Sequence, residues 1–211
     1  MFQLVDIQPR EFQLSILETC KHNNTLVVLP TGIGKTLISL LLALDRLNKF
    51  PESKALILSP TKPLSQQHIN TFKQNTNIDH EQILLLTGVI NANKRAELWK
   101  NARVIIATPQ TIQKDLENSR INLKDFSMLC IDEAHHSREN FANTHVTKYY
   151  LKQALNPRTL ALTASPGGTL DRIKEIMQNL NLDAVEIRSE TDLDVKKYIQ
   201  KRELEWINVE L

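Results

Sequence analysis

The stretch from Leu26 to Thr36 constrains the fold of this chain more than any other. It runs an apolar segment, Leu-Val-Val-Leu, into a loop with glycines at positions 32 and 34 and ends on Lys-Thr. Glycine lets the backbone turn tightly and point successive N–H groups at one place, where a following helix also presents its positive end. The sequence therefore predicts a strand, a phosphate-binding loop and a helix in direct succession.

Short apolar runs alternate with helical patterns along most of the chain. Because the runs are nearly continuous in valine, isoleucine and leucine, we expect a parallel sheet with helices on both faces. The predicted strands are 25–29, 55–59, 83–87, 104–107, 128–132, 159–163 and 184–187. The predicted helices are 10–22, 35–49, 62–75, 93–101, 143–155 and 169–180. Right-handed crossovers then place the C-terminal ends of the strands, with the motifs that follow them, at one edge of an α/β domain.

Composition narrows the class of protein without identifying it. The 211 residues suit one substantial domain, and a net charge of +2 neither requires nor excludes a polyanionic partner. Cys20 and Cys130 lack metal-site or redox spacing and fit core thiols in a reducing compartment. No apolar run approaches the roughly 18 residues of a membrane span, and the N-terminus does not read as a signal peptide. We expect a soluble intracellular protein, cytoplasmic if its source is prokaryotic, with no membrane partner.

Lys35 and Thr36 give the glycine loop its predicted chemistry. The lysine would bridge the β and γ phosphates of a nucleotide, and the threonine hydroxyl would coordinate magnesium, which takes its other ligands from water and phosphate. Leu29 stands where the strict loop pattern has its first glycine. The plain alternative is therefore a glycine turn with a helix-capping threonine, but the strand before and the helix after favour the phosphate loop.

A second apolar run, beginning at Met128, ends on the carboxylates Asp132 and Glu133. At a strand end, Asp132 could hold magnesium directly or through water, and Glu133 could orient and deprotonate the attacking water. An isolated Asp-Glu pair is more often a solvated turn, so the pair gains its weight from the loop upstream. Together the two motifs predict hydrolysis of a nucleoside triphosphate, with Lys35, Asp132 and Glu133 as the catalytic residues.

These motifs, in this order, resemble those of superfamily 2 helicases. Residues 31–36 match motif I, 132–135 match motif II and 163–165 match motif III. Residues 60–68 match motif Ia, 87–88 the short motif that follows it, and 107–111 motif Ib. The resemblance implies a RecA-like P-loop domain that uses ATP and Mg²⁺. Within the superfamily the chain is similar to the archaeal helicase-nuclease of stalled forks and the Fanconi anaemia group M translocase, on 162–166, 188–190, 194–195 and 205–206.

The resemblance also implies roles for individual residues. Gln13 would recognise the adenine base, and Thr36 and Asp132 would bind the metal. The residues for which nucleotide contacts are implied are Arg10, Gln13, Thr31, Gly32, Ile33, Gly34, Lys35 and Thr36. Coupling of the ATP site to nucleic acid is implied for His135, Thr163 and Ser165, and contact with the nucleic-acid backbone for Thr61, Lys62, Gln67, Gly88, Thr108 and Gln110. Taken alone, Gln13 would be an ordinary glutamine of a surface helix and Lys62 a solvated lysine.

The resemblance further implies a second RecA-like domain in the full-length protein, carrying arginines that reach the γ phosphate across a cleft. No such motif follows Ser165, so we expect residues 1–211 alone to hydrolyse ATP slowly. The predicted function is the N-terminal motor domain of an ATP-dependent DNA helicase or translocase, nucleoid-associated in a prokaryote, that acts on forked or branched DNA in replication repair.

Three alternatives remain open at this point. An RNA helicase or double-stranded RNA sensor would share the same motif layout. A small-molecule kinase would share the phosphate loop, but it needs a lid and an acceptor pocket, and the matches to motifs Ia and Ib argue against it. A binding module that has lost catalysis would be expected to show damage at Lys35, Asp132 or Glu133, and all three are intact.

Overall fold

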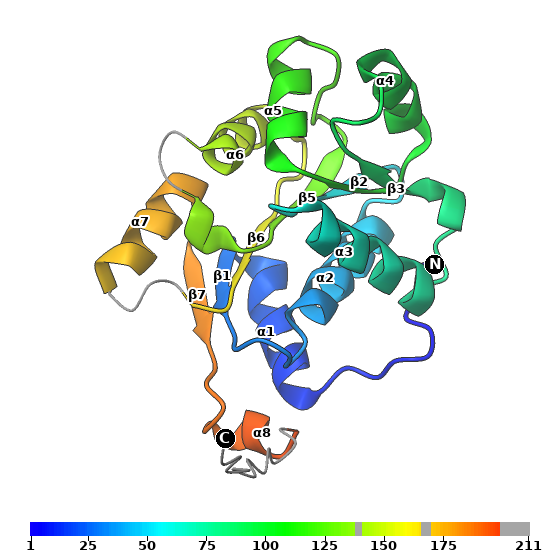
Figure 1. Cartoon of the computed structure of the whole chain (residues 1–211). Coiled ribbons are helices and arrows are strands. Elements are labelled where there is room, and N and C mark those ends of the chain that lie inside the picture. The colour runs from blue at the N-terminus through cyan, green and yellow to red at the C-terminus, as the bar shows by residue number, and fades with distance from the viewer. Residues whose placement is uncertain (138–140, 166–169, 199–211) are drawn as a thin grey trace, which may run out of the picture.

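The computed structural model describes residues 1–137, 141–165 and 170–198. Its strands are β1 (Thr25–Val28), β2 (Lys54–Leu58), β3 (Ile83–Leu86), β4 (Val104–Ala107), β5 (Phe126–Ile131), β6 (Thr159–Thr163) and β7 (Ala184–Ile187). They form one sheet in the order β3-β4-β2-β5-β6-β1-β7, and every pairing between them is parallel (Figure 1). The predicted parallel sheet is confirmed, although β5 begins and ends earlier than expected, so that Asp132 follows the strand.

The helices are α1 (Glu11–His22), α2 (Lys35–Lys49), α3 (Lys62–Asn75), α4 (Ala92–Asn101), α5 (Pro109–Glu117), α6 (Ala142–Gln153), α7 (Leu170–Leu180) and α8 (Leu193–Lys196). The described residues also form two short 3₁₀ helices, η1 (His80–Gln82) and η2 (Ala134–His136). Helices α5 and α8 were not among those expected. Helix α5 has proline at its first position, which suits a helix start, but its nine residues offer only a short apolar pattern.

Two apolar layers hold the helices to the sheet. On one face, Val27 of β1 belongs to a buried cluster with residues of α1, α2 and α3. On the other face, Leu26 and Val28 belong to a cluster with residues of α4, α5, α6 and α7. Successive strand residues point to opposite faces, and here both faces are covered. This double burial is why the strands read as continuous apolar runs in the sequence.

The C-terminal ends of the central strands meet at one edge of the sheet. The N–H of Leu29, just after β1, donates to the carbonyl of Thr163 at the end of β6 at 3.0 Å, and the N–H of Asp132 donates to the carbonyl of Leu58 at the end of β2 at 2.8 Å. Open α/β sheets bind ligands at this edge. None of the helices that the structure describes is long and apolar enough to cross a membrane.

Candidate functional site

The loop between β1 and α2 has the backbone that the glycines predict. Gly32 and Gly34 have φ angles of 81° and 96°, in the region that favours glycine. At Gly34, the N-cap of α2, a Cβ atom would also displace the side-chain amide of Gln13, so the positive φ is what requires glycine and the contact with Gln13 adds to it. Nζ of Lys35 donates to the carbonyl of Leu29 at 3.2 Å and lies across the loop. The lysine, the loop N–H groups and the start of α2 together offer a phosphate positive charge and donors.

Gln13 is only 2% exposed, so it is not an ordinary surface glutamine. Its Oε1 accepts from the backbone N–H of Arg10 at 2.8 Å, and its Nε2 donates to the carbonyls of Ile33 and Gly34 at 3.4 and 3.3 Å. The side chain therefore ties the start of α1 to the phosphate loop. This contact places Gln13 beside the loop, as the resemblance implies for a residue that reads the base.

The segment after β7 packs against the start of α1. The guanidinium of Arg10 lies over the ring of Tyr198, 5.0 Å from its centre, and the rings of Tyr198 and Phe12 are 5.9 Å apart. Lys197 pairs with Glu11 across 186 positions of sequence. Nothing in the sequence pattern indicates this contact, because no periodicity connects residues so far apart.

The two carboxylates after β5 lie in different environments. Asp132 is 7% exposed; its Oδ2 is 2.8 Å from Nε2 of His68, and its Oδ1 accepts from the N–H of Glu133 at 3.0 Å. Glu133 is partly exposed, and its Oε2 lies 3.3 Å from Nδ1 of His135. Its φ of 50° is unusual for a residue with a side chain, and such strain gathers at functional sites.

His135 connects this turn to the end of β6. Its Nδ1 lies 3.1 Å from Oγ1 of Thr163, which itself donates to the carbonyl of Ser165 at 3.1 Å. Because the threonine hydroxyl has one proton, Nδ1 of His135 must donate. Burial, and then the neighbouring His136, lower the pKa of His135, which favours the neutral ring with its proton on Nδ1. The structure thus brings the three predicted coupling residues together.

The donor set at this edge suits magnesium. Within the residues that the structure describes, no three His, Cys, Asp or Glu side chains form a metal cluster of their own. Magnesium seldom uses such a cage: it takes one or two protein oxygens, retains water and shares the phosphates of its nucleotide. Thr36 in the first turn of α2 and Asp132 after β5 provide a hydroxyl and a carboxylate of the right kind.

The predicted nucleic-acid residues occupy the other half of the same edge. They follow β2, β3 and β4, which are neighbours in the sheet, whereas the ATP motifs follow β1, β5 and β6. Thr61 caps the start of α3 with its side chain, and Thr108 is at the N-cap position of α5. Gly88 and Gln110 line one hollow of about 190 Å³. The residues that are exposed are Thr61, Lys62, Gln67, Gly88 and Gln110, with Thr108 half-buried.

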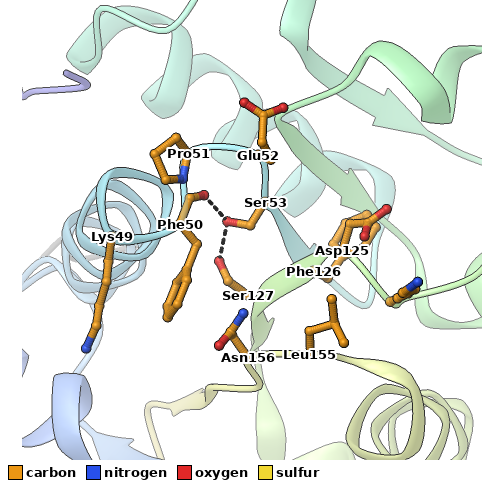
Figure 2. A pocket seen from close by; sticks show the side chains of 11 residues that line it. Lys49, Phe50, Pro51, Glu52, Ser53, Asp125, Phe126, Ser127, Leu155 and Asn156 are labelled. Atoms are coloured by element: carbon orange, nitrogen blue, oxygen red, sulfur yellow. Dashed lines mark hydrogen bonds between the residues drawn. The ribbon is translucent and has the colours of Figure 1, made fainter.

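A pocket of about 290 Å³ lies at the opposite edge, where β2 and β5 begin (Figure 2). Figure 2 shows Ser53 reaching both the carbonyl of Phe50 and the hydroxyl of Ser127, each at 2.7 Å. None of the predicted site residues lines it. Since ligands of α/β sheets bind at the C-terminal ends of strands, this pocket is not the nucleotide site.

Comparison with known proteins agrees with this geometry. Residues 10–173 match the family model described as DEAD/DEAH box helicase. The ATP-dependent DNA helicase MPH1 of Scheffersomyces stipitis is 36% identical over 94% of this chain and 19% of its own length. The DEAD-box ATP-dependent RNA helicase FANCM of Arabidopsis thaliana is 38% identical over 96% of this chain and 15% of its own length.

A crystal structure of the Pyrococcus furiosus Hef helicase domain has the same fold. It superposes with a TM-score of 0.90 at 44% identity, covering 95% of this chain and 42% of that one. The chain spans 15% to 26% of the length of the curated relatives that it matches. The family match covers both motifs of the ATP site and the coupling residues at the end of β6. This chain belongs to the DEAD/DEAH box helicase family.

Proposed function

We propose that this chain is the ATP-binding motor domain of an ATP-dependent DNA helicase or translocase that acts inside the cell on forked or branched DNA. The observation that carries the proposal is the meeting, at one sheet edge, of the phosphate loop, the Asp132-Glu133 turn and the bond from His135 to Thr163. Relatives named ATP-dependent DNA helicases, from Scheffersomyces stipitis and Schizosaccharomyces pombe, support DNA as the substrate.

In this proposal each residue of the ATP site has one task. Lys35 holds the β and γ phosphates of ATP, while Thr36 and Asp132 hold the metal. Mg²⁺, when bound, neutralises the charge that develops on the phosphate oxygens. Glu133 accepts a proton from the water whose oxygen attacks the γ phosphorus, and ADP carries the leaving oxygen.

Coupling to nucleic acid runs through hydrogen bonds at the same edge. His135 contacts both Glu133, the base of this mechanism, and Thr163 at the end of β6. A shift at Glu133 would therefore reach Ser165, in the segment after β6, through three contacts: Glu133 to His135, His135 to Thr163, and Thr163 to Ser165. We propose that this path links the state of the nucleotide to the groove that holds the strand.

That groove needs a second wall. The residues after β2, β3 and β4 offer hydroxyl, amide, backbone N–H and lysine donors, the groups that bind phosphates and sugars without reading sequence. We propose that a second RecA-like domain of the full-length protein supplies the other wall and the arginines that reach the γ phosphate. The Hef helicase domain, of which this chain covers 42%, has room for such a domain.

Fluorescence anisotropy across a salt series tests the nucleic-acid part of the proposal. Forked DNA, duplex DNA of unrelated sequence and duplex RNA serve as probes for residues 1–211. We expect weak binding that weakens as salt rises, because each phosphate contact releases counterions, and Lys62→Ala should reduce the salt slope by about 1. The matched control is Lys148→Ala on α6, distant in sequence from these motifs. Affinity that is strong, sequence-specific and independent of salt would contradict the proposal.

A second candidate function rests on one observation. The Arabidopsis relative is named an RNA helicase, although it covers about the same share of this chain as the relatives named DNA helicases. The anisotropy series separates the two candidate functions, because it compares the affinities of a DNA duplex and an RNA duplex of equal length for the same protein. Tighter binding of the RNA duplex would replace DNA by RNA in the proposal and leave the ATP site unchanged.

A further inference from the structure

His68 is a buried histidine that touches the ATP site from another element. It lies on α3, is 2% exposed, and its Nε2 is 2.8 Å from Oδ2 of Asp132. The two residues are 64 positions apart in the sequence. Helix α3 begins at Lys62 and is capped by Thr61, both predicted to contact nucleic acid. A single buried hydrogen bond therefore joins the nucleic-acid helix to the carboxylate proposed to hold the metal.

The direction of this hydrogen bond follows from the chemistry of its partners. An ionised carboxylate can only accept, so Nε2 of His68 donates. In the described part of the chain, the other ring nitrogen, Nδ1, is buried and has no hydrogen-bond partner. Burying an unpaired ring nitrogen costs free energy that an apolar side chain would avoid. Packing alone does not explain a histidine here, whereas its bond to Asp132 does.

The bond also limits what Asp132 can do. Each carboxylate oxygen has two acceptor positions. His68 takes one on Oδ2 and the N–H of Glu133 takes one on Oδ1, so both oxygens are anchored and each keeps one position. A carboxylate held at both oxygens cannot rotate freely about its last bond. Its remaining lone pairs are therefore fixed before any ligand arrives.

We propose that His68 is a positioning residue for the metal site: it holds the Asp132 carboxylate in the orientation that binds nucleotide-bound Mg²⁺, and it ties that orientation to helix α3. The proposal rests on the proposed function, since it assumes Mg²⁺-nucleotide at this edge. Partners of this kind orient metal ligands in many sites, and losing one typically weakens metal affinity about 10- to 100-fold.

Calorimetric titration of ADP tests this inference, because it measures how strongly ADP affinity depends on Mg²⁺ and needs no measurement of turnover. Each protein is titrated in excess Mg²⁺ and again in EDTA, and the ratio of the two affinities is its Mg²⁺ dependence. For His68→Leu we expect this ratio to fall about 10-fold, with affinity in EDTA unchanged. His68→Gln should restore most of the ratio, because its amide nitrogen can occupy the place of Nε2. His68→Asn is one methylene shorter and should not.

The matched control is Phe72→Leu, one turn further along the same buried face of α3. It should lower the free energy of unfolding and leave the Mg²⁺ dependence as in the wild type. A wild-type Mg²⁺ dependence in His68→Leu would overturn the inference. If that variant does not fold, His68→Gln and His68→Asn decide: equal ratios for these two would overturn it as well.

The same titrations separate this inference from the function on which it rests. Failure of the wild type to bind ADP in either buffer would remove the proposed nucleotide site itself. Binding by the wild type with a clear Mg²⁺ dependence, retained in full by His68→Leu, would remove only the role of His68.

Discussion

Among single residues, Glu133 combines strain with its proposed catalytic role. Its φ of 50° costs a residue with a Cβ roughly 1–2 kcal/mol, and glycine avoids that cost. We predict that Glu133→Gly is more stable to urea than Glu133→Ala by about 1 kcal/mol, although glycine usually destabilises relative to alanine. Both variants lose the carboxylate, so their difference reports the backbone alone. An alanine variant as stable as the glycine variant would show that the turn carries no strain.

The cysteines are the second residue-scale prediction. Burial raises the pKa of the Cys20 thiol to about 12 and raises that of Cys130 as well, and neither side chain is exposed. At pH 8 only about 1 in 10⁴ of the Cys20 thiols is therefore ionised, and the thiolate is the reactive form. We expect neither cysteine to react with a thiol-specific chromogenic disulfide in the folded protein and both to react in urea. Rapid reaction of the native protein would contradict the buried placement.

The ion pair between Arg95 and Asp115 belongs to the element scale, because it fixes α4 against α5. Nε and Nη2 of the arginine each lie 2.7 Å from a carboxylate oxygen, and both side chains are buried. Removing one partner leaves a buried charge, so Asp115→Ala should lower the free energy of unfolding by about 3–5 kcal/mol. The control is Glu117→Ala, an exposed residue of the same helix, which should change it by less than about 0.5 kcal/mol. Urea unfolding followed by circular dichroism measures both, and a similar small loss in each would contradict the pair's importance.

Elements also show how far sequence reasoning reaches. All seven strands were predictable as short runs of apolar residues between turns. Burial on both faces explains the central runs, such as β1 and β6, whereas the edge strand β7 is only partly buried and contains Glu186. Helix α5 was not, since Ile112 and Leu116 alone carry its apolar spacing. The contact of His68 with Asp132 depends on how α3 packs over the sheet, which no local pattern records. Residues 166 and 205–206, which carry part of the resemblance to the fork-repair helicases, lie outside the described residues.

The whole molecule sets the limit on turnover. The residues that bind phosphate lie in this chain, whereas the arginines that would complete the site are proposed to lie in a second domain. An arginine finger is worth about 10³–10⁵ in rate in related phosphoryl-transfer enzymes. We therefore predict very slow phosphate release by residues 1–211, unchanged by forked DNA, and DNA-stimulated release once the native downstream sequence is added. Robust DNA-stimulated hydrolysis by residues 1–211 would contradict this prediction, because it would show that the chain does not need arginines from a second domain.

The nucleotide site is the central claim, and a titration of Mg²⁺-ADP into wild type and Lys35→Ala tests it most directly. Loss of a charged hydrogen-bond donor to phosphate should cost about 1.5–3 kcal/mol, so the variant should bind roughly 10- to 100-fold more weakly. Lys62→Ala, which removes a lysine from the nucleic-acid half of the same edge, is the matched control and should bind ADP as the wild type does. Equal affinity of the wild type and Lys35→Ala would contradict the assignment of the loop, and with it the account of this chain as a motor domain.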